Sequence, residues 1–310
     1  MGRSLKKTRT REGEEKKTTM HSFLKRALPY LLILPGVIFV GAILIYPMIS
    51  GVISSFLTQH PLNPSDQEFV GIEHFSKMFS DDIFIQAFKN TILWTVGIVV
   101  AQYIIGLGVA LLLNEQFPGR GVYRSLILIP WVVPMIAVAL TWKWIYAADF
   151  GVLNYILDEI GLISRNVDWL GDPSSSLLSV MAVTIWKNVP FVAIVLLAGL
   201  QSIDKQMYEA ASIDSANIFQ RFWYITLPSL KGVSLVILTL TTIWTFNQFD
   251  LIYLMTKGGP ANSSQIIPVY SYLNAFNYLN INYAAAIATF GAVIMSVFIV
   301  LYIRNTREEG

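Results

Sequence analysis

The chain alternates between long stretches without charge and shorter polar segments. Seven stretches contain no Asp, Glu, Lys or Arg: 27–65, 90–114, 125–142, 173–186, 188–203, 232–249 and 258–303. A helix needs about 20 mostly apolar residues to cross a bilayer. The pattern predicts an all-α integral membrane fold with six spans, at about 28–56, 88–113, 124–147, 176–200, 231–255 and 284–303. Burying this many apolar helices in a soluble protein would leave too little polar surface to cover them.

Prolines disturb several of these spans. They lie at Pro29, Pro35 and Pro47 in the first, Pro130 and Pro134 in the third, and Pro190 in the fourth. Proline removes a backbone donor and clashes with the preceding turn, so the third and fourth spans are expected to be interrupted. Such breaks persist in a membrane where neighbouring helices or a water-filled cavity satisfy the freed groups.

Polar side chains also occur within the spans. Lys187 and Asn188 precede Pro190, and Asn247, Gln248 and Asp250 share the fifth span. Polar groups at membrane depth are costly and usually face a pathway or a partner. For the two lysines inside spans, Lys143 and Lys187, the alternative is that the ammonium snorkels to an interface.

The segments on one side of the membrane read as loops. Residues 57–87 and 148–175 are polar, the latter with a short amphipathic stretch at 153–160, and residues 256–283 open on a Gly-Gly-Pro break. Aromatic residues follow this break at Tyr270, Tyr272, Phe276 and Tyr278. They suit an aromatic belt at the membrane interface, and stacking on a sugar face is the alternative.

The composition argues against an enzyme. Hydrophobic residues make up 54% of the chain and charged residues 14%, against about 25% charged in an ordinary soluble domain. The chain has no cysteine and no Gly-Lys dipeptide, hence no thiolate nucleophile and no P-loop. The histidines, His21, His60 and His74, are scattered outside the spans. We expect no catalytic residue, metal or cofactor in this chain, and no nucleic-acid partner.

The positive charges predict the orientation. Sixteen Lys and Arg residues fall in segments on one side, including residues 1–27 and 304–310, and four fall on the other. Because the positive side faces the cytoplasm, the leader 1–27 and the tail 304–310 are both expected inside. The first span lacks a following small-x-small cleavage site, so it is interpreted as an uncleaved anchor.

The inner segment 201–230 is the longest and has its own helical signals. Asp204 can cap a helix that begins at Lys205, and Ser215 and Asn217 could interrupt it. A second amphipathic piece, 219–223, leads to Pro228. The physical pattern fits two interpretations equally: a docking element for a partner, or an amphipathic helix resting on lipid.

A motif in this segment resembles a known family. Residues 209–228 read Glu-Ala-Ala-x3-Ser-x9-Ile-x-Leu-Pro. The inner-membrane permeases of binding-protein-dependent ABC importers carry the same motif with Gly in place of Ser215. Further stretches resemble the carbohydrate branch of that family: 90–91, 129–130, 186–187, 249–253 and 256–260. Glycine at the departing position permits a left-handed turn, which serine adopts at a cost of roughly 1 kcal/mol.

The resemblance implies a permease domain, 28–303, with a coupling helix between the fourth and fifth spans. It assigns contact with an ATPase subunit to Tyr208, Glu209, Ala210, Ala211, Asp214, Ser215, Phe222, Leu227 and Pro228. ATP and Mg would be held by a cytoplasmic ATPase dimer. A second homologous permease, an extracytoplasmic solute-binding protein and membrane lipid would be the other partners, in a bacterial or archaeal inner membrane.

The expected cargo is a sugar or oligosaccharide moved by alternating access. We predict its path between the fourth and fifth spans, along Asn188, Trp244, Asn247, Gln248 and Asp250. A sugar site needs polar groups beside aromatics, and Trp244, Asn247 and Gln248 would share one helix face. Alternatively, these groups bridge helices, worth about 0.6 kcal/mol each. A polyol or glycerol-phosphate-type substrate, or an ion-coupled secondary transporter, are the other functions considered.

Overall fold

The computed structural model describes residues 28–60 and 63–307, and it divides at Ser54 into two compact units. The described part of the first unit is a single helical segment, Leu28–Ser54, that continues through its prolines. It contains a π-helical turn, η1 (Gly41–Ile45), followed by α2 (Tyr46–Ser54). The wider turn directly precedes Pro47 and accommodates the clash of the proline ring with the preceding turn. The predicted leader, 1–27, lies outside the described residues.

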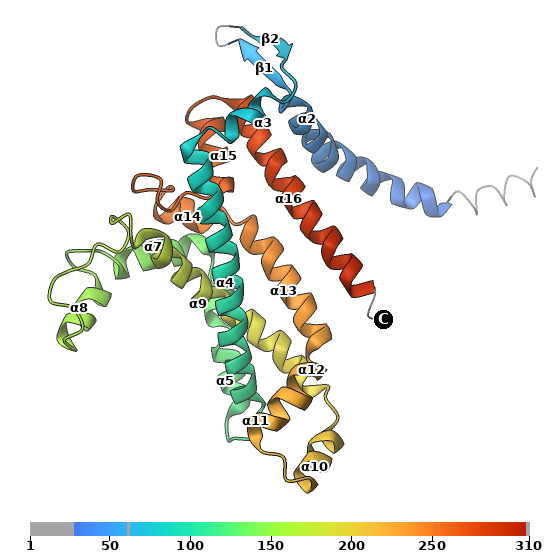
Figure 1. The fold of residues 1–310 in the computed structure, drawn as a ribbon, viewed down its shortest axis with the longest axis vertical. Coiled ribbons are helices and arrows are strands. Elements are labelled where there is room, and N and C mark those ends of the chain that lie inside the picture. The colour runs from blue at the N-terminus through green and yellow to red at the C-terminus, as the bar shows by residue number, and fades with distance from the viewer. Residues whose placement is uncertain (1–27, 61–62, 308–310) are drawn as a thin grey trace, which may run out of the picture. The chain divides into compact units, whose positions relative to one another are not determined.

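The second unit is mostly helical (Figure 1). Its long helices are α4 (Asp82–Asn114), α9 (Ser176–Gln201), α13 (Lys231–Phe246) and α16 (Ile281–Arg307). The shorter elements are β1 (Leu57–His60), β2 (Asn63–Phe69), α3 (Glu73–Met78), α5 (Arg120–Leu126), α6 (Ile129–Val132), α7 (Met135–Ile145), α8 (Val152–Glu159), α10 (Lys205–Ile213), α11 (Ile218–Arg221), η2 (Phe222–Thr226), α12 (Leu227–Ser229), α14 (Asp250–Met255) and α15 (Ile267–Phe276).

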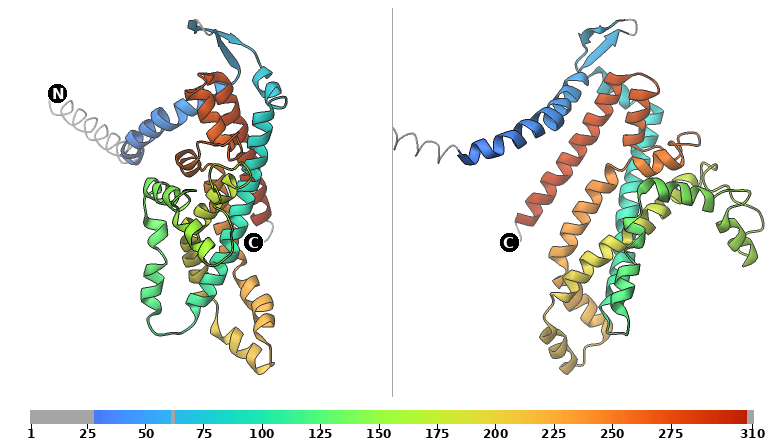
Figure 2. Two further views of the ribbon diagram at one scale, coloured as in Figure 1. Left: turned by 90° about the vertical axis from the view of Figure 1, so that its left-hand side faces the viewer. Right: turned by 180° about the vertical axis from the view of Figure 1, so that it is seen from behind.

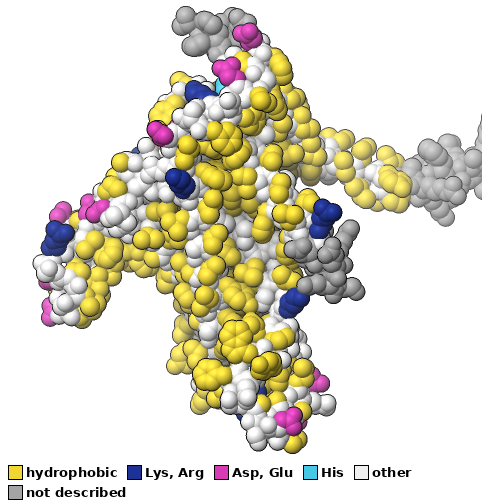
Figure 3. Space-filling view, in the orientation of Figure 1, with side chains coloured by type: hydrophobic (Ala, Val, Ile, Leu, Met, Phe, Trp, Pro, Cys, Tyr) yellow, Lys and Arg dark blue, Asp and Glu magenta, His cyan; other side chains and the backbone are white. Residues whose placement is uncertain are grey.

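Five helical segments are long and apolar enough to cross a membrane: Leu28–Ser54, Asp82–Asn114, Ser176–Gln201, Lys231–Met255 and Ile281–Tyr302. The third predicted span is a helix pair, Arg120–Val132 and Met135–Ile145, bent by 89° at the break that Pro130 and Pro134 predicted. The described chain therefore carries five spans, or six if the bent pair counts as one. On the face shown in Figure 3, hydrophobic side chains cover much of the long helices.

The centre of the second unit is the pair α4 and α9, with α13 alongside (Figure 2). A small residue lets the pair approach closely: a Cβ atom on Gly106 would lie 2.8 Å from Cγ1 of Val192. Leu107, Ala110 and Leu196 are buried in the same apolar cluster. Such small-residue contacts are typical of helix pairs in membranes.

The N-terminal end of α4 is tied to two other helices by one carboxylate. The hydroxyls of Tyr270 in α15 and Tyr283 in α16 donate to Oδ2 of Asp81, at 2.5 and 2.6 Å. Burial raises the pKa of Asp81, but hydrogen bonds from both tyrosines and from the amides of Phe84 and Ile83 outweigh it, so the pKa lies below its ordinary value. The assignment of Tyr270 to an interfacial belt is wrong, because its side chain is buried against this carboxylate.

Other expectations also need correction. The fold is not wholly α-helical, since β1 and β2 form an antiparallel hairpin that a polar, non-alternating sequence did not reveal. Helix α9 continues through Pro190, which is buried, instead of breaking there. Helix α4 begins six residues before the predicted start of its span, since the Asp81 side chain caps it by accepting from the amides of Ile83 and Phe84. Helix α15 lies within the expected loop 256–283.

Candidate functional site

A cavity of about 460 Å³ lies between α4, α6, α9 and the α13–α14 segment. All five residues predicted for a substrate path line it: Asn188, Trp244, Asn247, Gln248 and Asp250. The other lining residues are Gln102, Trp131, Met135, Phe191, Thr241, Ile243, Thr245 and Phe249. The structure thus brings together a set that the sequence places on two spans and adds residues from two further segments.

One wall of the cavity is a row of aromatic rings from three helices. Trp131 of α6 stacks on Phe191 of α9, with ring centroids 5.4 Å apart and planes 17° apart. Phe191 in turn contacts Trp244 of α13, also at 5.4 Å. Trp244 lines the cavity and remains 54% exposed.

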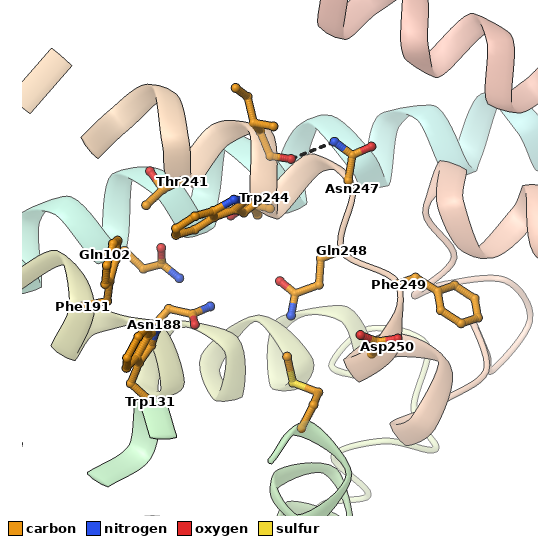
Figure 4. Close-up of a pocket in the computed structure, with 13 residues that line it drawn as sticks. Gln102, Trp131, Asn188, Phe191, Thr241, Trp244, Asn247, Gln248, Phe249 and Asp250 are labelled. Atoms are coloured by element: carbon orange, nitrogen blue, oxygen red, sulfur yellow. Dashed lines mark hydrogen bonds between the residues drawn. The ribbon is translucent and has the colours of Figure 1, made fainter. Parts of the chain in front are cut away.

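The cavity is also lined by a group of side-chain amides. Figure 4 shows Gln102 of α4, Asn188 of α9 and Gln248 of the segment between α13 and α14 directed into the same space. Gln102 is 1% exposed, and its Nε2 donates to the carbonyl oxygen of Thr184 at 3.4 Å. Amides beside aromatic faces can recognise a ligand that presents both hydroxyl groups and an apolar surface.

Trp244, Asn247 and Gln248 were expected on one face of a continuous helix, but the helix of the fifth span is interrupted there. Helix α13 ends at Phe246, and α14 begins at Asp250. The side-chain Nδ2 of Asn247 donates to the Ile243 carbonyl at 2.8 Å, which engages the amide within its own segment (Figure 4). Side-chain bonds of this kind compete with the helical ladder. Gln248 therefore reaches the cavity from an irregular segment and not from a continuous helix.

The sequence left open whether the Lys187 ammonium faces a pathway, a partner or a membrane interface. Its side chain is 6% exposed, and Nζ donates to the carbonyl oxygens of Pro130, Trp131 and Val133 at 3.3, 3.0 and 2.7 Å. Snorkelling to an interface is therefore wrong for Lys187. Lys143, in the last turn of α7, is exposed, and its role stays a prediction.

Eight lining residues were not predicted from the sequence, among them Gln102, Trp131 and Phe191. Gln102 is the one side-chain amide between Asn90 and Asn114 in a charge-free stretch, and that isolation is the signal that could have found it. Trp131 and Phe191 have no such signal, because aromatic residues are common throughout the spans.

Residues 201–230, predicted to hold the coupling helix, form a second candidate site, here called the coupling segment. Asp204 accepts from the amide of Gln206 and caps α10, as predicted. The helix ends in a Schellman motif: the amides of Ser215 and Ala216 donate to the carbonyls of Ser212 and Ala211 at 3.1 and 2.9 Å. Ser215 occupies the left-handed region with φ of 58°, the conformation that glycine favours.

The second half of the coupling segment is anchored to the first. Asn217 and Gln220 form a capping box at the start of α11, and the Nε of Arg221 donates to the carbonyl of Ala216 at 2.9 Å. The hydroxyl groups of Tyr208 and Thr226 are hydrogen-bonded at 2.9 Å. These contacts fix the angle between α10 and the helices that lead into α13.

The residues predicted to contact an ATPase lie in this anchored segment. Those with exposed side chains are Glu209, Ala210, Asp214, Ser215 and Pro228, and those partly buried are Tyr208, Ala211, Phe222 and Leu227. Large apolar side chains beside them are also exposed: Ile213 at 85%, Ile218 at 79% and Phe219 at 77%. The segment offers a mixed apolar and acidic surface.

Comparison with known proteins gives consistent similarities. Residues 102–306 match the family described as binding-protein-dependent transport system inner membrane component. The chain is 37% identical over 293 residues to the trehalose/maltose transport system permease protein MalF of Thermococcus litoralis, covering 94% of this chain and 97% of that protein. It is 34% identical over 284 residues to the sulfoquinovosyl glycerol transport system permease protein SmoG of Agrobacterium fabrum, covering 92% of each. Its fold is similar to that of a chain in the crystal structure of a bacterial alginate ABC transporter in complex with an alginate pentasaccharide-bound periplasmic protein, with a TM-score of 0.79, 26% identity, and coverage of 93% and 96%.

Proposed function

Because the chain belongs to the family of binding-protein-dependent transport system inner membrane components, we propose that it is the pore-forming permease subunit of an ATP-driven sugar importer. The family is a transport component and not a catalytic subunit. In this proposal a solute-binding protein delivers the sugar from outside. A second homologous permease completes the pore, and a cytoplasmic ATPase dimer supplies the energy from ATP and Mg.

The observation that carries the proposal is the cavity between two broken spans. Its aromatic row and its convergent amides suit a sugar, which presents an apolar ring face and many hydroxyl groups. In alternating access the cavity would open to one side of the membrane at a time. Closure of the ATPase dimer would move the coupling segment, and α13, which follows it directly, would transmit the movement to the cavity.

The lining favours an uncharged sugar over a glycerol-phosphate-type substrate. Among the described residues that line the cavity, Asp250 is the one ionisable group, and it is acidic. Phosphate and carboxylate groups are normally bound by Arg, Lys or backbone amides. An anionic substrate would meet the Asp250 carboxylate without a lining cation to offset it.

Reconstitution would test the proposal. The chain, its partner permease and the ATPase are assembled in proteoliposomes, and uptake of neutral disaccharides and of glycerol phosphate is measured with the cognate binding protein. We expect uptake to require ATP and to favour the neutral sugars. Uptake by this chain alone, driven by an ion gradient, would instead establish a secondary transporter.

Alanine substitutions would test the cavity itself. We expect Gln248→Ala to weaken the apparent sugar affinity of the assembled importer by about two- to tenfold, the effect of one lost hydrogen bond. Asn247→Ala should have a smaller effect, because the Asn247 amide is already bonded to Ile243. Gln116→Ala, in the exposed segment after α4, is the matched control. Unchanged affinity and transport rate in Gln248→Ala, with normal expression, would make the cluster structural.

A further inference from the structure

We propose that Lys187 is a positioning residue that pins the break in the third span and thereby holds one wall of the cavity. The inference rests on the proposed function of the cavity. It concerns a group that does not line the cavity itself, since its ammonium is directed at backbone carbonyls.

The break leaves carbonyl groups without helical donors. In a regular helix the carbonyl of residue 130 would accept from the amide of residue 134, but Pro134 has no amide hydrogen. The carbonyls of Trp131 and Val133 lie at the point where the chain turns by 89° into α7. In a bilayer such groups need partners from the protein, because no water is available in the hydrocarbon.

An ammonium group suits this task. It carries three N–H donors on one atom, and the structure uses all three on the three carbonyls. A positive charge is also favourable at the C-terminal end of a helix, where Arg120–Val132 stops. A neutral amide has two donors on its nitrogen and no net charge, so it cannot replace these contacts fully.

The pinned segment forms the cavity wall. Trp131, whose carbonyl Lys187 holds, begins the aromatic row, and Asn188, the next residue after Lys187, presents an amide to the same space. Met135, across the break, also lines the cavity. Lys187 therefore fixes the spacing between α6 and α9, and with it the distance between the Trp131 ring and the Asn188 amide.

Spin labels would measure the pin directly. The chain has no cysteine, so labels attach only at introduced cysteines. Val122 and Trp144 lie on the two arms of the bend and are exposed. In the assembled importer we expect a narrow distance distribution between these sites, which broadens in Lys187→Met and narrows again in Lys187→Arg. Lys143→Met, an exposed lysine on one arm, should match the unsubstituted chain.

Transport kinetics would connect the pin to the cavity. We expect Lys187→Met to raise the apparent KM for sugar by about tenfold, with Lys187→Arg restoring most of the affinity. A purely structural anchor would lower the amount of assembled importer and leave KM unchanged. If Lys187→Met does not assemble, Lys187→Gln, which keeps two donors, is measured in the same way. An unchanged distance distribution in the variant would overturn the pin, whereas an unaffected KM in Gln248→Ala would overturn the sugar cavity and leave the distances valid.

Discussion

Apolar side chains are buried in the helix pair α4 and α9, but many are exposed in the coupling segment. In the pair, Leu107, Val192 and Leu196 are buried within the chain, and Gly106 lets the two backbones approach. In the coupling segment, Ile213 and Phe219 are among the most exposed large apolar side chains of the described residues.

The chain completes the apolar contacts of the α4–α9 pair by itself, whereas the exposed apolar side chains of the coupling segment would need a partner to be buried. The α4–α9 interface is filled by its own side chains, so its sequence is constrained by packing. Exposed apolar side chains beside exposed acidic groups, outside the spans, are what the proposed contact with an ATPase subunit would need. We expect substitutions in the pair to change stability, and substitutions on the coupling segment to change activity of the assembled importer.

The largest effect should come from reversing a charge on the coupling segment. Glu209 is exposed on α10. We expect Glu209→Lys to lower sugar-stimulated ATP hydrolysis to about a tenth or less, because a charge buried against an ATPase subunit would be reversed. Membrane insertion and thermal stability should be retained.

A matched control is Glu159→Lys, the same change on an exposed residue of α8. It should hydrolyse ATP like the unsubstituted importer. Normal sugar-stimulated hydrolysis in Glu209→Lys would remove the distinction between the two regions, since the exposed segment would then have no coupling role.

The packed pair should respond in stability. A Cβ atom on Gly106 would lie 3.3 Å from the backbone nitrogen of Ala193 as well as 2.8 Å from Val192, and a backbone atom cannot rotate away. We expect Gly106→Ala to destabilise the chain by about 1–3 kcal/mol through overpacking. Gly108 has no atom within 4 Å of its Cβ position. Gly108→Ala should be neutral or stabilising, because alanine favours the helix.

Thermal unfolding of both variants in detergent, followed by circular dichroism, compares them directly. Equal unfolding temperatures for Gly106→Ala and Gly108→Ala would mean that the close approach of α4 and α9 does not contribute to stability.

The sequence predicts the spans well and their ends less well. Long charge-free stretches identify the spans because bilayer thickness sets a minimum apolar length. Helix α4 begins six residues before the start of the predicted span, since Asp81, Asp82 and Lys89 resemble a loop in a charge pattern. The hairpin β1–β2 was missed because its strands are mostly polar and do not alternate.

The site residues show the same limit. Asn188 and Gln248 stand out as amides in apolar stretches, and the structure places both on one cavity. The partners of Lys187 could not be predicted, because three backbone carbonyls have no signature in the sequence. Proline at 134 marks where a donor is missing, but it does not show which side chain replaces it.

The smallest expected effect is on the stability of the turn at Ser215, within the coupling segment. Ser215 adopts a left-handed backbone conformation in the Schellman motif that ends α10, and this conformation is strained for a residue with a Cβ atom. Glycine removes this strain of roughly 1 kcal/mol, but it also loses more backbone entropy on folding, by roughly 0.5–1 kcal/mol. We expect Ser215→Gly to stabilise the turn slightly, seen as slower hydrogen exchange of the amides of Ser215 and Ala216.

Ser212→Gly is the matched control, because it makes the same change three residues earlier, inside α10. There serine already has helical geometry, so glycine relieves no strain. It adds entropy to the unfolded chain and removes the hydrogen bond from the Ser212 hydroxyl to the Tyr208 carbonyl, so exchange should accelerate. Opposite signs at the two positions would show that the motif's strain resides at Ser215. Faster exchange in both variants would mean that the turn is held by its contacts, such as Arg221 with Ala216, and not by the conformation of Ser215. Coupled ATP hydrolysis should survive in Ser215→Gly, because the substitution preserves the backbone path and leaves Glu209 in place.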